Sequence, residues 1–359
     1  MKAYIESMGC DSNVADANQI TKYLKANNVD IVSDPKEADY IFLMSCGFNN
    51  IILNNNIKRL RELRKFNAKL ILGGCIPKIK KEITKEVDFF FYPKEINKLD
   101  DFFSFKLSLN SFSPSFKRED KKIIRIATGC EGNCSYCAIK IANGKTTSRS
   151  ISDISQDIRE GLAEGFNKFL FTSEDNGSWG QDIGLSIIDL IKEINNINGN
   201  FKISLTTFNP QWFIRYPEMY DILRTDKIEK KIYFPLQSGS DRILKLMNRR
   251  YTVKDYLYIF NKLKKEIPEI KIQTDVLIGF PSETEEDFKK TLDLIEKLDI
   301  FFLQVFVYTD MKNTPSLKLK PKILSQIAKD RANKIISRFL DKNKNEKRKL
   351  VNTNLNNHR

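Results

Sequence analysis

Short apolar runs of strand-forming residues alternate with helical patterns along most of this 359-residue chain. Four such runs come first, at residues 2–10, 38–46, 68–75 and 87–93. Six more follow, at residues 122–129, 168–175, 201–208, 231–238, 270–280 and 301–309. Strands that alternate with helices form parallel sheets whose faces are covered by the helices. The sequence therefore predicts an α/β protein.

The six later runs, with the helical patterns between them, predict a partial barrel. Residues 154–166 and 284–298 are examples of these amphipathic patterns, and Thr284 is the expected N-cap of the second. Six strand–helix units are too few for a closed barrel of eight. They suit an open (β/α)6 barrel, with its functional loops at the carboxyl ends of the strands.

Changes in composition divide the chain into three segments. Residues 100–122 are rich in Ser, Phe and charged residues and contain Pro114, so we interpret them as a linker. From Pro321 the pattern is basic and helical, and we expect a helix to begin at this proline. The predicted segments are an N-terminal parallel α/β domain at 1–117, a partial barrel at 118–320 and a basic helical extension at 321–359.

The charge of the chain favours an anionic partner. Sixty Lys and Arg residues against 46 Asp and Glu give a formal net charge of +14, and such an excess suits the phosphates of nucleic acids. The one histidine, His358, stands next to the C-terminal residue. Its position excludes Ser-His-Asp triads and His-ligated zinc from the body of the chain.

The sequence also predicts a cytoplasmic protein without membrane contact. No run approaches the ~18 apolar residues of a membrane span. The first residues carry acidic and polar side chains where a secretory signal needs an apolar core. Cysteines stay reduced in the cytoplasm, so the six cysteines indicate metal binding or catalysis rather than disulfides.

Three cysteines, here called the loop cysteines, lie close together at Cys130, Cys134 and Cys137. They follow the first strand of the second series, at the end where such architectures place their chemistry. Each thiolate could hold one iron of a cubane iron–sulfur cluster and leave the fourth iron open to a ligand. A zinc site would lack a fourth ligand nearby. Three unligated buried cysteines are the remaining alternative.

The other three, here called the strand-end cysteines, each end an apolar run, at Cys10, Cys46 and Cys75. In a parallel sheet these strand ends meet at one edge, which is the usual ligand edge of such sheets. Gly73 and Gly74 would let the backbone approach closely there. The three thiols could hold a second cluster with an open iron, or each could be an ordinary buried cysteine.

The segment GCEGNCSYCAIK at 129–140, with aromatic Tyr136 before the last cysteine, resembles the radical S-adenosylmethionine superfamily. The strand-end cysteines that precede it make the chain similar to the methylthiotransferases. Further matching segments are GCDSNVAD at 9–16, TSEDNGSWGQDIG at 172–184, PLQSGSD at 235–241 and TDVLIGFPSETEEDF at 274–288. Within the family, the chain looks most like the archaeal and eukaryotic branch.

This resemblance implies two 4Fe-4S clusters and S-adenosylmethionine as cofactors. The loop cysteines would bind the cluster that cleaves S-adenosylmethionine to methionine and a 5′-deoxyadenosyl radical. The strand-end cysteines would bind an auxiliary cluster, whose open iron carries the sulfur to be inserted. All six cysteines are therefore expected to be metal ligands with a catalytic role.

The resemblance also implies contacts with S-adenosylmethionine. Ser173 and Glu174 are expected near the methionine amine, although Glu174 or Asp175 could instead cap the following turn. Ribose hydroxyls or the methionine carboxylate would be bound by other polar side chains, and a glycine would shape the loop against the adenine. The residues expected at the cofactor are Tyr136, Ser173, Glu174, Gln237, Ser238, Asp275 and Gly279.

Arg149 is the candidate contact for a phosphate or carboxylate of the substrate, because a guanidinium can bind either group through two nitrogens. It could equally be a surface arginine without such a role. The branch that the chain resembles acts on N6-threonylcarbamoyladenosine beside the tRNA anticodon and places a methylthio group on C2 of the adenine. A tRNA, an electron donor and a sulfur source are therefore the expected partners.

The chain departs from this family after Leu340, where no strand pattern for the usual small C-terminal β-barrel (the TRAM domain) follows. A basic tail could anchor the substrate instead, through Lys342, Lys344, Lys347, Arg348 and Lys349. Two alternative functions are a methylthiotransferase acting on a protein or peptide side chain, and a non-catalytic iron–sulfur RNA-binding protein.

Overall fold

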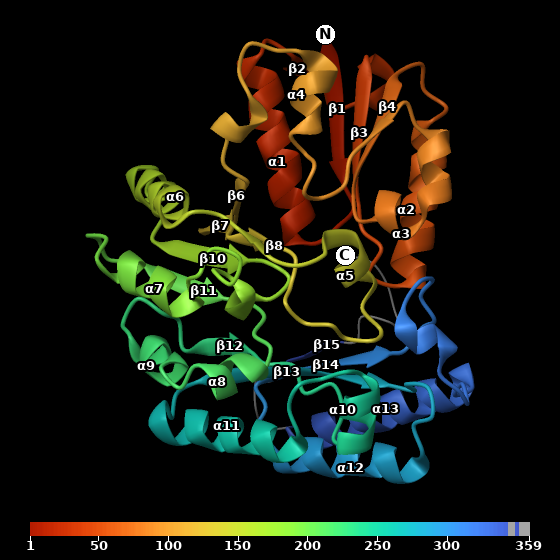
Figure 1. Ribbon diagram of the computed structural model, residues 1–359, viewed down its shortest axis with the longest axis vertical. Coiled ribbons are helices and arrows are strands. Elements are labelled where there is room, and N and C mark those ends of the chain that lie inside the picture. The colour runs from red at the N-terminus through yellow and green to blue at the C-terminus, as the bar shows by residue number, and fades with distance from the viewer. Residues whose placement is uncertain (344–348, 352–359) are drawn as a thin grey trace. The chain divides into compact units, whose positions relative to one another are not determined.

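The computed structural model describes residues 1–343 and 349–351, which form two compact units (Figure 1). Unit 1 contains residues 1–131, 137–203 and 311–313, and unit 2 contains residues 132–136, 204–310 and those from 314 onward. The division passes through the cysteine loop, so Cys134 belongs to unit 2, whereas Cys130 and Cys137 belong to unit 1. Because compactness and domain organisation are different properties, the segment boundaries at 117 and 320 stay a prediction.

Unit 1 begins with a five-stranded sheet in the order β2-β1-β3-β4-β5, in which the neighbouring strands run parallel. Its elements are β1 (Lys2–Ser7), α1 (Asp11–Ala26), β2 (Asp30–Ile31), β3 (Tyr40–Ser45), α2 (Asn50–Leu63), β4 (Lys69–Gly74), α3 (Ile76–Ile79), β5 (Phe89–Phe90) and α4 (Lys98–Phe103). The α/β prediction is confirmed here strand by strand.

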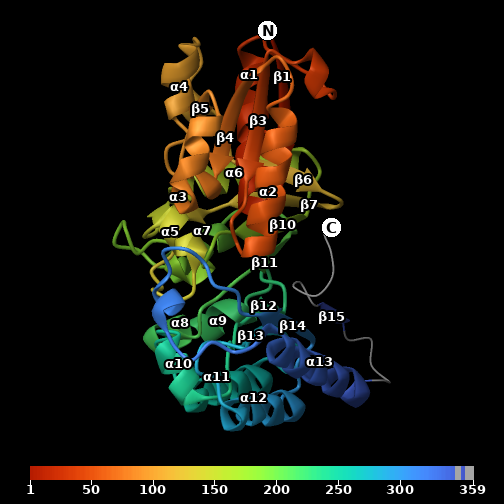
Figure 2. The ribbon, with the colours of Figure 1, turned by 90° about the vertical axis from the view of Figure 1, so that its right-hand side faces the viewer.

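Helices cover both faces of this sheet, as Figures 1 and 2 show. Ile20 and Tyr23 of α1 and Leu99 of α4 pack with Phe42 and Ile71 on one face. On the other face, apolar residues of α2 and α3 pack against β3 and β4; these are Leu53, Ile57, Leu60, Ile76 and Ile79. Burial on both faces explains why β3 and β4 read as continuous apolar runs.

The second sheet of unit 1 has the order β11-β10-β7-β6. The remaining elements are β6 (Ser115–Arg118), β7 (Lys121–Arg125), β8 (Ala127–Thr128), α5 (Ala138–Asn143), β9 (Thr147–Ser148), α6 (Ile151–Ala163), β10 (Lys168–Thr172), α7 (Ile187–Asn195) and β11 (Lys202–Leu205). Strands β7 and β10 run parallel, and β6 is antiparallel to β7.

The linker prediction for residues 100–122 is wrong. Phe102 and Phe103 pack on the first sheet together with buried Leu109 and with Phe112, and residues 115–118 form β6. Short turns present these aromatic side chains one at a time, so the segment has neither the period of a helix nor that of a strand although its residues belong to the core.

Unit 2 is built on a sheet with the order β12-β13-β14-β15, whose strands are parallel. Its elements are α8 (Gln211–Arg215), α9 (Met219–Arg224), β12 (Lys231–Tyr233), α10 (Asp241–Leu246), α11 (Val253–Glu266), β13 (Lys271–Ile278), α12 (Glu285–Lys297), β14 (Phe302–Val307), α13 (Ser325–Lys342) and β15 (Lys349–Val351). All six strands of the second series are present, and Thr284 is the N-cap of α12 as predicted.

Two expectations about the C-terminal segment are wrong. The last helix, α13, begins at Ser325 rather than at Pro321, because the carbonyl of Pro321 accepts a hydrogen bond from the Ser282 N–H at 2.7 Å and Leu324, with φ of −58° and ψ of 135°, is not helical. The segment is also not wholly helical, since Lys349–Val351 form β15 beside β14. His358 and the tail residues Lys344, Lys347 and Arg348 lie outside the described residues.

Candidate functional site

The strand-end cysteines converge as predicted. Each follows its strand closely, and the register pairs Ser7 of β1 with Met44 of β3, and Ser45 of β3 with Gly74 of β4. Burial, with a smaller effect of the nearby Cys10, raises the pKa of Cys46 to about 12. Burial, followed by Cys46 and Cys10, also raises the pKa of Cys75. These electrostatic effects require the three thiols to be neighbours.

Backbone N–H groups face the three sulfur atoms. Those of Phe48 and Cys10 lower the pKa of the Cys46 thiol, against the larger effect of burial. The Gly47 N–H does the same for Cys75, and the N–H groups of Ser12 and Asn13 at the start of α1 do so for Cys10. Cys46 and Cys75 are buried, whereas Cys10 as a residue is exposed although protein atoms surround its sulfur. Donors aimed at sulfur stabilise thiolates, which are the form that binds metal.

Glycines allow this close approach at the end of β4. A Cβ on Gly73 would lie 2.4 Å from the Phe91 ring, and one on Gly74 would lie 2.3 Å from the Ser45 carbonyl oxygen. Gly74 also has a φ of +88°. The strands can therefore carry Cys46 and Cys75 side by side only because no side chain stands at these two positions.

The loop cysteines of unit 1 are held by polar side chains from the end of β10. The Glu174 carboxylate accepts hydrogen bonds from the Gly129 N–H at 2.7 Å and from Asn143 Nδ2 at 2.6 Å. Asp175 Oδ2 and Ser178 Oγ lie 3.7 and 3.9 Å from Cys130 Sγ. Glu174 thus joins the residue before Cys130 to the helix that follows Cys137.

Segments that carry cysteines of the two sets contact each other within unit 1. Helix α3, which follows Cys75, packs through Ile76 and Ile79 in the same apolar cluster as Ala138 and Ala142 of α5. The charge of Glu174 acts on both Cys10 and Cys75, although burial is the larger influence on each thiol. The α3–α5 contact therefore links the two cysteine-bearing segments directly.

A buried ion pair adds a second link in unit 1. Arg125 of β7 bonds to Asp16 of α1, the helix that follows Cys10, and to the hydroxyl of Thr128, two residues before Cys130. Both charged side chains are almost fully buried. Nothing in the sequence pattern singled out this pair, because its members stand 109 residues apart.

Arg149 has an internal role in the structure. Its Nη1 donates to the Asp157 carboxylate at 2.7 Å and to the Arg125 carbonyl at 2.9 Å. Ser173 Oγ likewise donates to Asn176 Oδ1 in the next turn at 2.6 Å. Their assignment to substrate and cofactor stays a prediction that would require these contacts to be shared or exchanged.

Several predicted cofactor residues of unit 2 form one buried group. Asp275 accepts hydrogen bonds from Gln237 Nε2 at 2.6 Å and from Tyr233 Oη at 2.7 Å. Burial raises the pKa of Asp275 to about 6, and the Tyr233 hydroxyl opposes this shift. Tyr136 packs its ring edge-to-face against Phe280. Tyr233, Gln237 and Asp275 therefore form a buried polar group, and the Tyr136 ring is near enough to be affected by the Asp275 charge.

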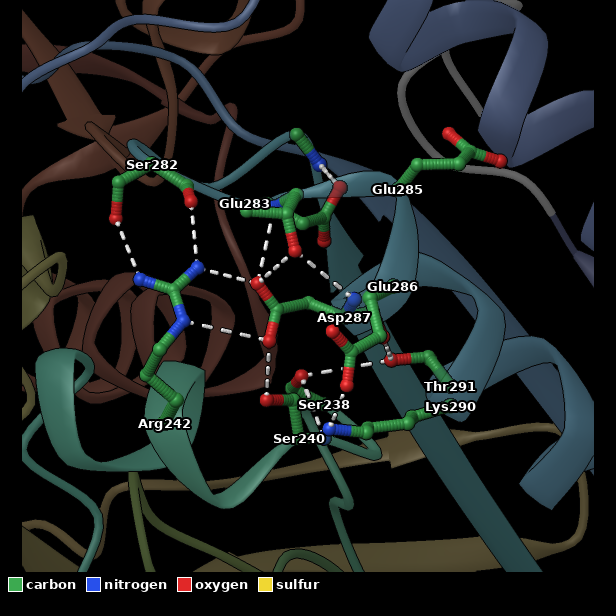
Figure 3. Close-up of polar contacts among 12 residues, drawn as sticks. Ser238, Ser240, Arg242, Ser282, Glu283, Glu285, Glu286, Asp287, Lys290 and Thr291 are labelled. Atoms are coloured by element: carbon green, nitrogen blue, oxygen red, sulfur yellow. Dashed lines mark hydrogen bonds and ion pairs between the residues drawn. The ribbon is translucent and has the colours of Figure 1, made fainter.

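Ser238 and Gly279 take part in hydrogen bonds around α12, where the Gly279 N–H donates to Glu283 Oε2 at 3.0 Å. Figure 3 shows Ser238 next to Ser240 and Thr291, and its Oγ accepts from the Ser240 N–H at 3.2 Å. Asp287 lies at the centre of this network, where it bonds to Ser240, Arg242 and Thr284. Burial acts to raise the pKa of Asp287, but the bonds from Arg242, Ser240 and Thr284 outweigh it and hold that pKa below its usual range.

The donor type fits iron–sulfur clusters, because each of three thiolates can hold one iron of a cubane. A tetrahedral zinc would need a fourth ligand beside each set of three cysteines. Within residues 1–343 and 349–351, no three Cys, His, Asp or Glu side chains stand close enough to share one ion.

The chain matches two known family models. Residues 124–295 match the Radical SAM superfamily, and residues 2–91 match Uncharacterized protein family UPF0004. A structure of the radical S-adenosylmethionine methyltransferase TsrM from Kitasatospora setae superposes with a TM-score of 0.66 at 13% identity, over 88% of this chain and 77% of that one. That likeness shows the fold.

Two curated relatives define the family more narrowly. "Probable threonylcarbamoyladenosine tRNA methylthiotransferase" of Methanocaldococcus jannaschii is 30% identical over 96% of this chain and 83% of its own length. Ribosomal protein uS12 methylthiotransferase RimO of Carboxydothermus hydrogenoformans is 32% identical, over 94% and 82%. The chain belongs to the radical S-adenosylmethionine methylthiotransferases, whose cofactors are 4Fe-4S clusters and S-adenosylmethionine. Across the described residues, no helix is long and apolar enough to cross a membrane.

Proposed function

We propose that this enzyme transfers a methylthio group to C2 of N6-threonylcarbamoyladenosine in tRNA. The observation that carries the reaction type is the contact within unit 1 between the segment after Cys75 and the segments that carry Cys130 and Cys137, through α3, α5 and Glu174. Insertion of a sulfur into a C–H bond needs a radical source and a sulfur carrier near the same atom. The arrangement of the cysteine-bearing segments supports both in one place.

The substrate class rests on the relatives and on charge. The archaeal relative at 30% identity is named for threonylcarbamoyladenosine tRNA, and proteins of the same name from other archaea match at 28–29%. The net charge of +14 suits a polyanion. A tRNA substrate and reduced thiols both favour the cytoplasm as the place of reaction.

Once bound, the two clusters and S-adenosylmethionine supply the radical, the sulfur and the methyl group. We assign the strand-end cysteines to the cluster that carries sulfur and the loop cysteines to the cluster that cleaves the cofactor. Glu174 holds the loop through Gly129 and Asn143. Tyr233 and Gln237 orient the Asp275 carboxylate, which we assign to the polar groups of the cofactor. An electron donor and a sulfur source complete the set of partners.

The test is anaerobic assay of the full chain with reconstituted clusters, dithionite, S-adenosylmethionine and sulfide. We expect mass spectrometry of digested tRNA to show a methylthio group on threonylcarbamoyladenosine. A variant with the loop cysteines replaced by alanine is the control and should leave the nucleoside unchanged. Unmodified tRNA from an enzyme that holds both clusters and cleaves S-adenosylmethionine would contradict the substrate assignment.

A protein substrate is the second candidate, because the relative at 32% identity is named for ribosomal protein uS12. The same assay with that protein in place of tRNA distinguishes the two. Addition of sulfur and a methyl group to a side chain, with tRNA unchanged, would favour this candidate. Failure to cleave S-adenosylmethionine with both clusters present would instead favour the non-catalytic iron–sulfur protein.

A further inference from the structure

Cys134 is held differently from the other loop cysteines, by the segment that follows α10 in unit 2. The Ser135 N–H donates to the Met247 carbonyl at 3.0 Å, and Ser135 Oγ donates to the Leu246 carbonyl at 2.8 Å. Asn248 Nδ2 donates to the Asn133 carbonyl at 2.7 Å. The residues on both sides of Cys134 are therefore fixed by hydrogen bonds to three consecutive residues.

The next residue of that segment contacts the sulfur itself. Arg249 Nη1 donates to Cys134 Sγ at 3.2 Å, and Arg249 Nε donates to the Tyr251 hydroxyl at 3.1 Å. That hydroxyl lies 3.0 and 2.9 Å from the carbonyls of Pro235 and Leu236. Asn248 has a φ of +57°, a left-handed turn that asparagine tolerates, just before the arginine. Backbone and tyrosine together fix the direction of the guanidinium.

One nitrogen of the Arg249 guanidinium makes no hydrogen bond to the described residues. Arg249 Nη2 is buried and has no hydrogen-bond partner among the residues that the structure describes. A buried donor without an acceptor costs about 1–3 kcal/mol. The chain thus places a positive charge and an unsatisfied donor beside the one sulfur atom that Nη1 already contacts. This is the arrangement expected where a sulfur-rich anion completes the site.

We propose that Arg249 is a positioning residue that raises the reduction potential of the iron–sulfur cluster bound by the loop cysteines. The inference rests on the proposed assignment of Cys134 as a ligand of that cluster. Hydrogen bonds to cluster sulfurs and nearby charge are the levers by which a protein sets a cluster's potential. The cluster takes up one electron from an external reductant, and no bond forms or breaks. A fixed positive charge at Cys134 Sγ favours the state that holds this extra electron.

Arg149 and Arg249 differ in the groups that their guanidinium charges contact. The Arg149 guanidinium is neutralised by the Asp157 carboxylate at 2.7 Å. No carboxylate pairs with Arg249 in the described part of the chain, where its contacts are a thiol and a phenol. Within hydrogen-bond distance its charge therefore acts on the Cys134 sulfur and the Tyr251 hydroxyl, and the Asp275 carboxyl is affected from farther away. The sequence alone does not show which arginine contacts Cys134, because Arg249 stands next to Arg250, a residue of the same type.

The experiment measures the midpoint potential by a dithionite titration followed by electron paramagnetic resonance. The parent chain carries alanine at the three strand-end cysteines, so that only the loop cluster contributes. Arg249→Met and Arg249→Lys are compared with Arg250→Met, which alters an exposed neighbour, and with Ser135→Ala, which loosens the loop without touching the sulfur. Iron and sulfide per chain are measured for each variant.

We expect Arg249→Met to shift the potential to a lower value and Arg249→Lys to give a smaller shift. Arg250→Met and Ser135→Ala should keep the parent value. If Arg249→Met does not retain iron, the lysine variant decides, because it keeps the charge but not the geometry of the donor. An unchanged potential in the variants that retain iron, or the same shift in Ser135→Ala, overturns the inference alone. A parent chain that binds no iron overturns the cluster assignment as well.

Discussion

Cys46 and Cys75 are buried at the ends of neighbouring strands, whereas the loop cysteines are partly exposed in an irregular segment. The first group is positioned by backbone: parallel register, two glycines and N–H groups aimed at sulfur. The second is positioned by side chains: Glu174, Asp175 and Ser178 around Cys130, and Arg249 at Cys134. One site is thus specified by the fold itself and the other by individual polar residues.

Replacing each set of cysteines should give the largest effect and the plainest test of this comparison. Alanine at the loop cysteines should abolish cleavage of S-adenosylmethionine, because no ligand then holds the cluster that binds it. Alanine at the strand-end cysteines should leave cleavage but stop sulfur insertion. Reconstituted protein should fall from about eight to about four irons per chain in both cases, as two cubanes require.

Loss of the same cluster signal in both variants would show that the protein has one site built from both sets. Four irons in the unmodified chain, with no change on replacing the strand-end cysteines, would make those cysteines structural. Either result would remove the distinction between a backbone-held and a side-chain-held cluster.

Gly74→Ala should damage the strand-end site selectively. A Cβ there would lie 2.3 Å from the Ser45 carbonyl oxygen at a φ of +88°, so we expect a loss of about 2–4 kcal/mol in the free energy of unfolding. Iron content should fall toward that of the strand-end triple variant, as measured by colorimetric assay after reconstitution.

Gly165→Ala is the matched control, since Gly165 has a φ of +89° with nothing within 4 Å of the added Cβ. It should cost about 1 kcal/mol and leave iron content unchanged. Equal effects of the two substitutions would mean that backbone conformation, and not the close approach of β3 and β4, matters at Gly74.

Glu174→Gln should damage the loop site instead. The new amide nitrogen would face either the Gly129 N–H or Asn143 Nδ2, both of which are donors. A lost charge-assisted bond is worth about 1.5–3 kcal/mol, so a chelator should remove iron from the loop cluster about tenfold faster. The release rate is followed by absorbance in the strand-end triple variant.

Asp182→Asn provides the control, because Asp182 also accepts from a backbone N–H, that of Ser148 at 2.9 Å, but at an exposed position. Its removal should change stability by no more than about 0.5 kcal/mol and leave iron release unchanged. Faster release in both variants would indicate a general electrostatic effect rather than the tether at Gly129.

Asp287→Asn should destabilise unit 2 without affecting either cluster, and so should separate stability from metal binding. Loss of the charge that accepts from Arg242, Ser240 and Thr284 should cost about 2 kcal/mol at pH 7. The pKa of Asp287 lies below its usual range. Its contribution is therefore complete above the unfolded-state pKa of about 3.9 and is lost as the pH falls further.

Urea unfolding of wild type and Asp287→Asn across this pH range checks the sign, since the two curves should converge in acid. Glu286→Gln, in the same helical turn but exposed and paired with Lys290, should stay within about 0.5 kcal/mol of wild type. A fall in iron content with Asp287→Asn would show that the loop site depends on the stability of unit 2 as a whole.

The same distinction explains what could be predicted from the sequence. The sequence predicts that the strand-end cysteines meet, because each ends an apolar run and a parallel sheet brings the ends of β1, β3 and β4 to one edge. The partners of the loop site do not follow, since Glu174 bonds across 45 residues and Arg249 across 115. The sequence does not show that residues 100–122 belong to the core, because their aromatic side chains pack one at a time from turns. The start of α13 does not follow from the sequence either, because the Pro321 carbonyl accepts a hydrogen bond from the distant Ser282 N–H instead of one within a helix.

The contact between α3 and α5 determines where the gene can be divided. A fragment ending at residue 117 would retain Ile76 and Ile79 but lose Ala138 and Ala142, which share their cluster. The apolar surface so exposed would favour aggregation. A fragment that continues through residue 203 keeps this cover. The segments that match the two families are therefore not separable, because each contributes side chains to one hydrophobic contact. Fragments made for expression or crystallisation should keep both sides of it.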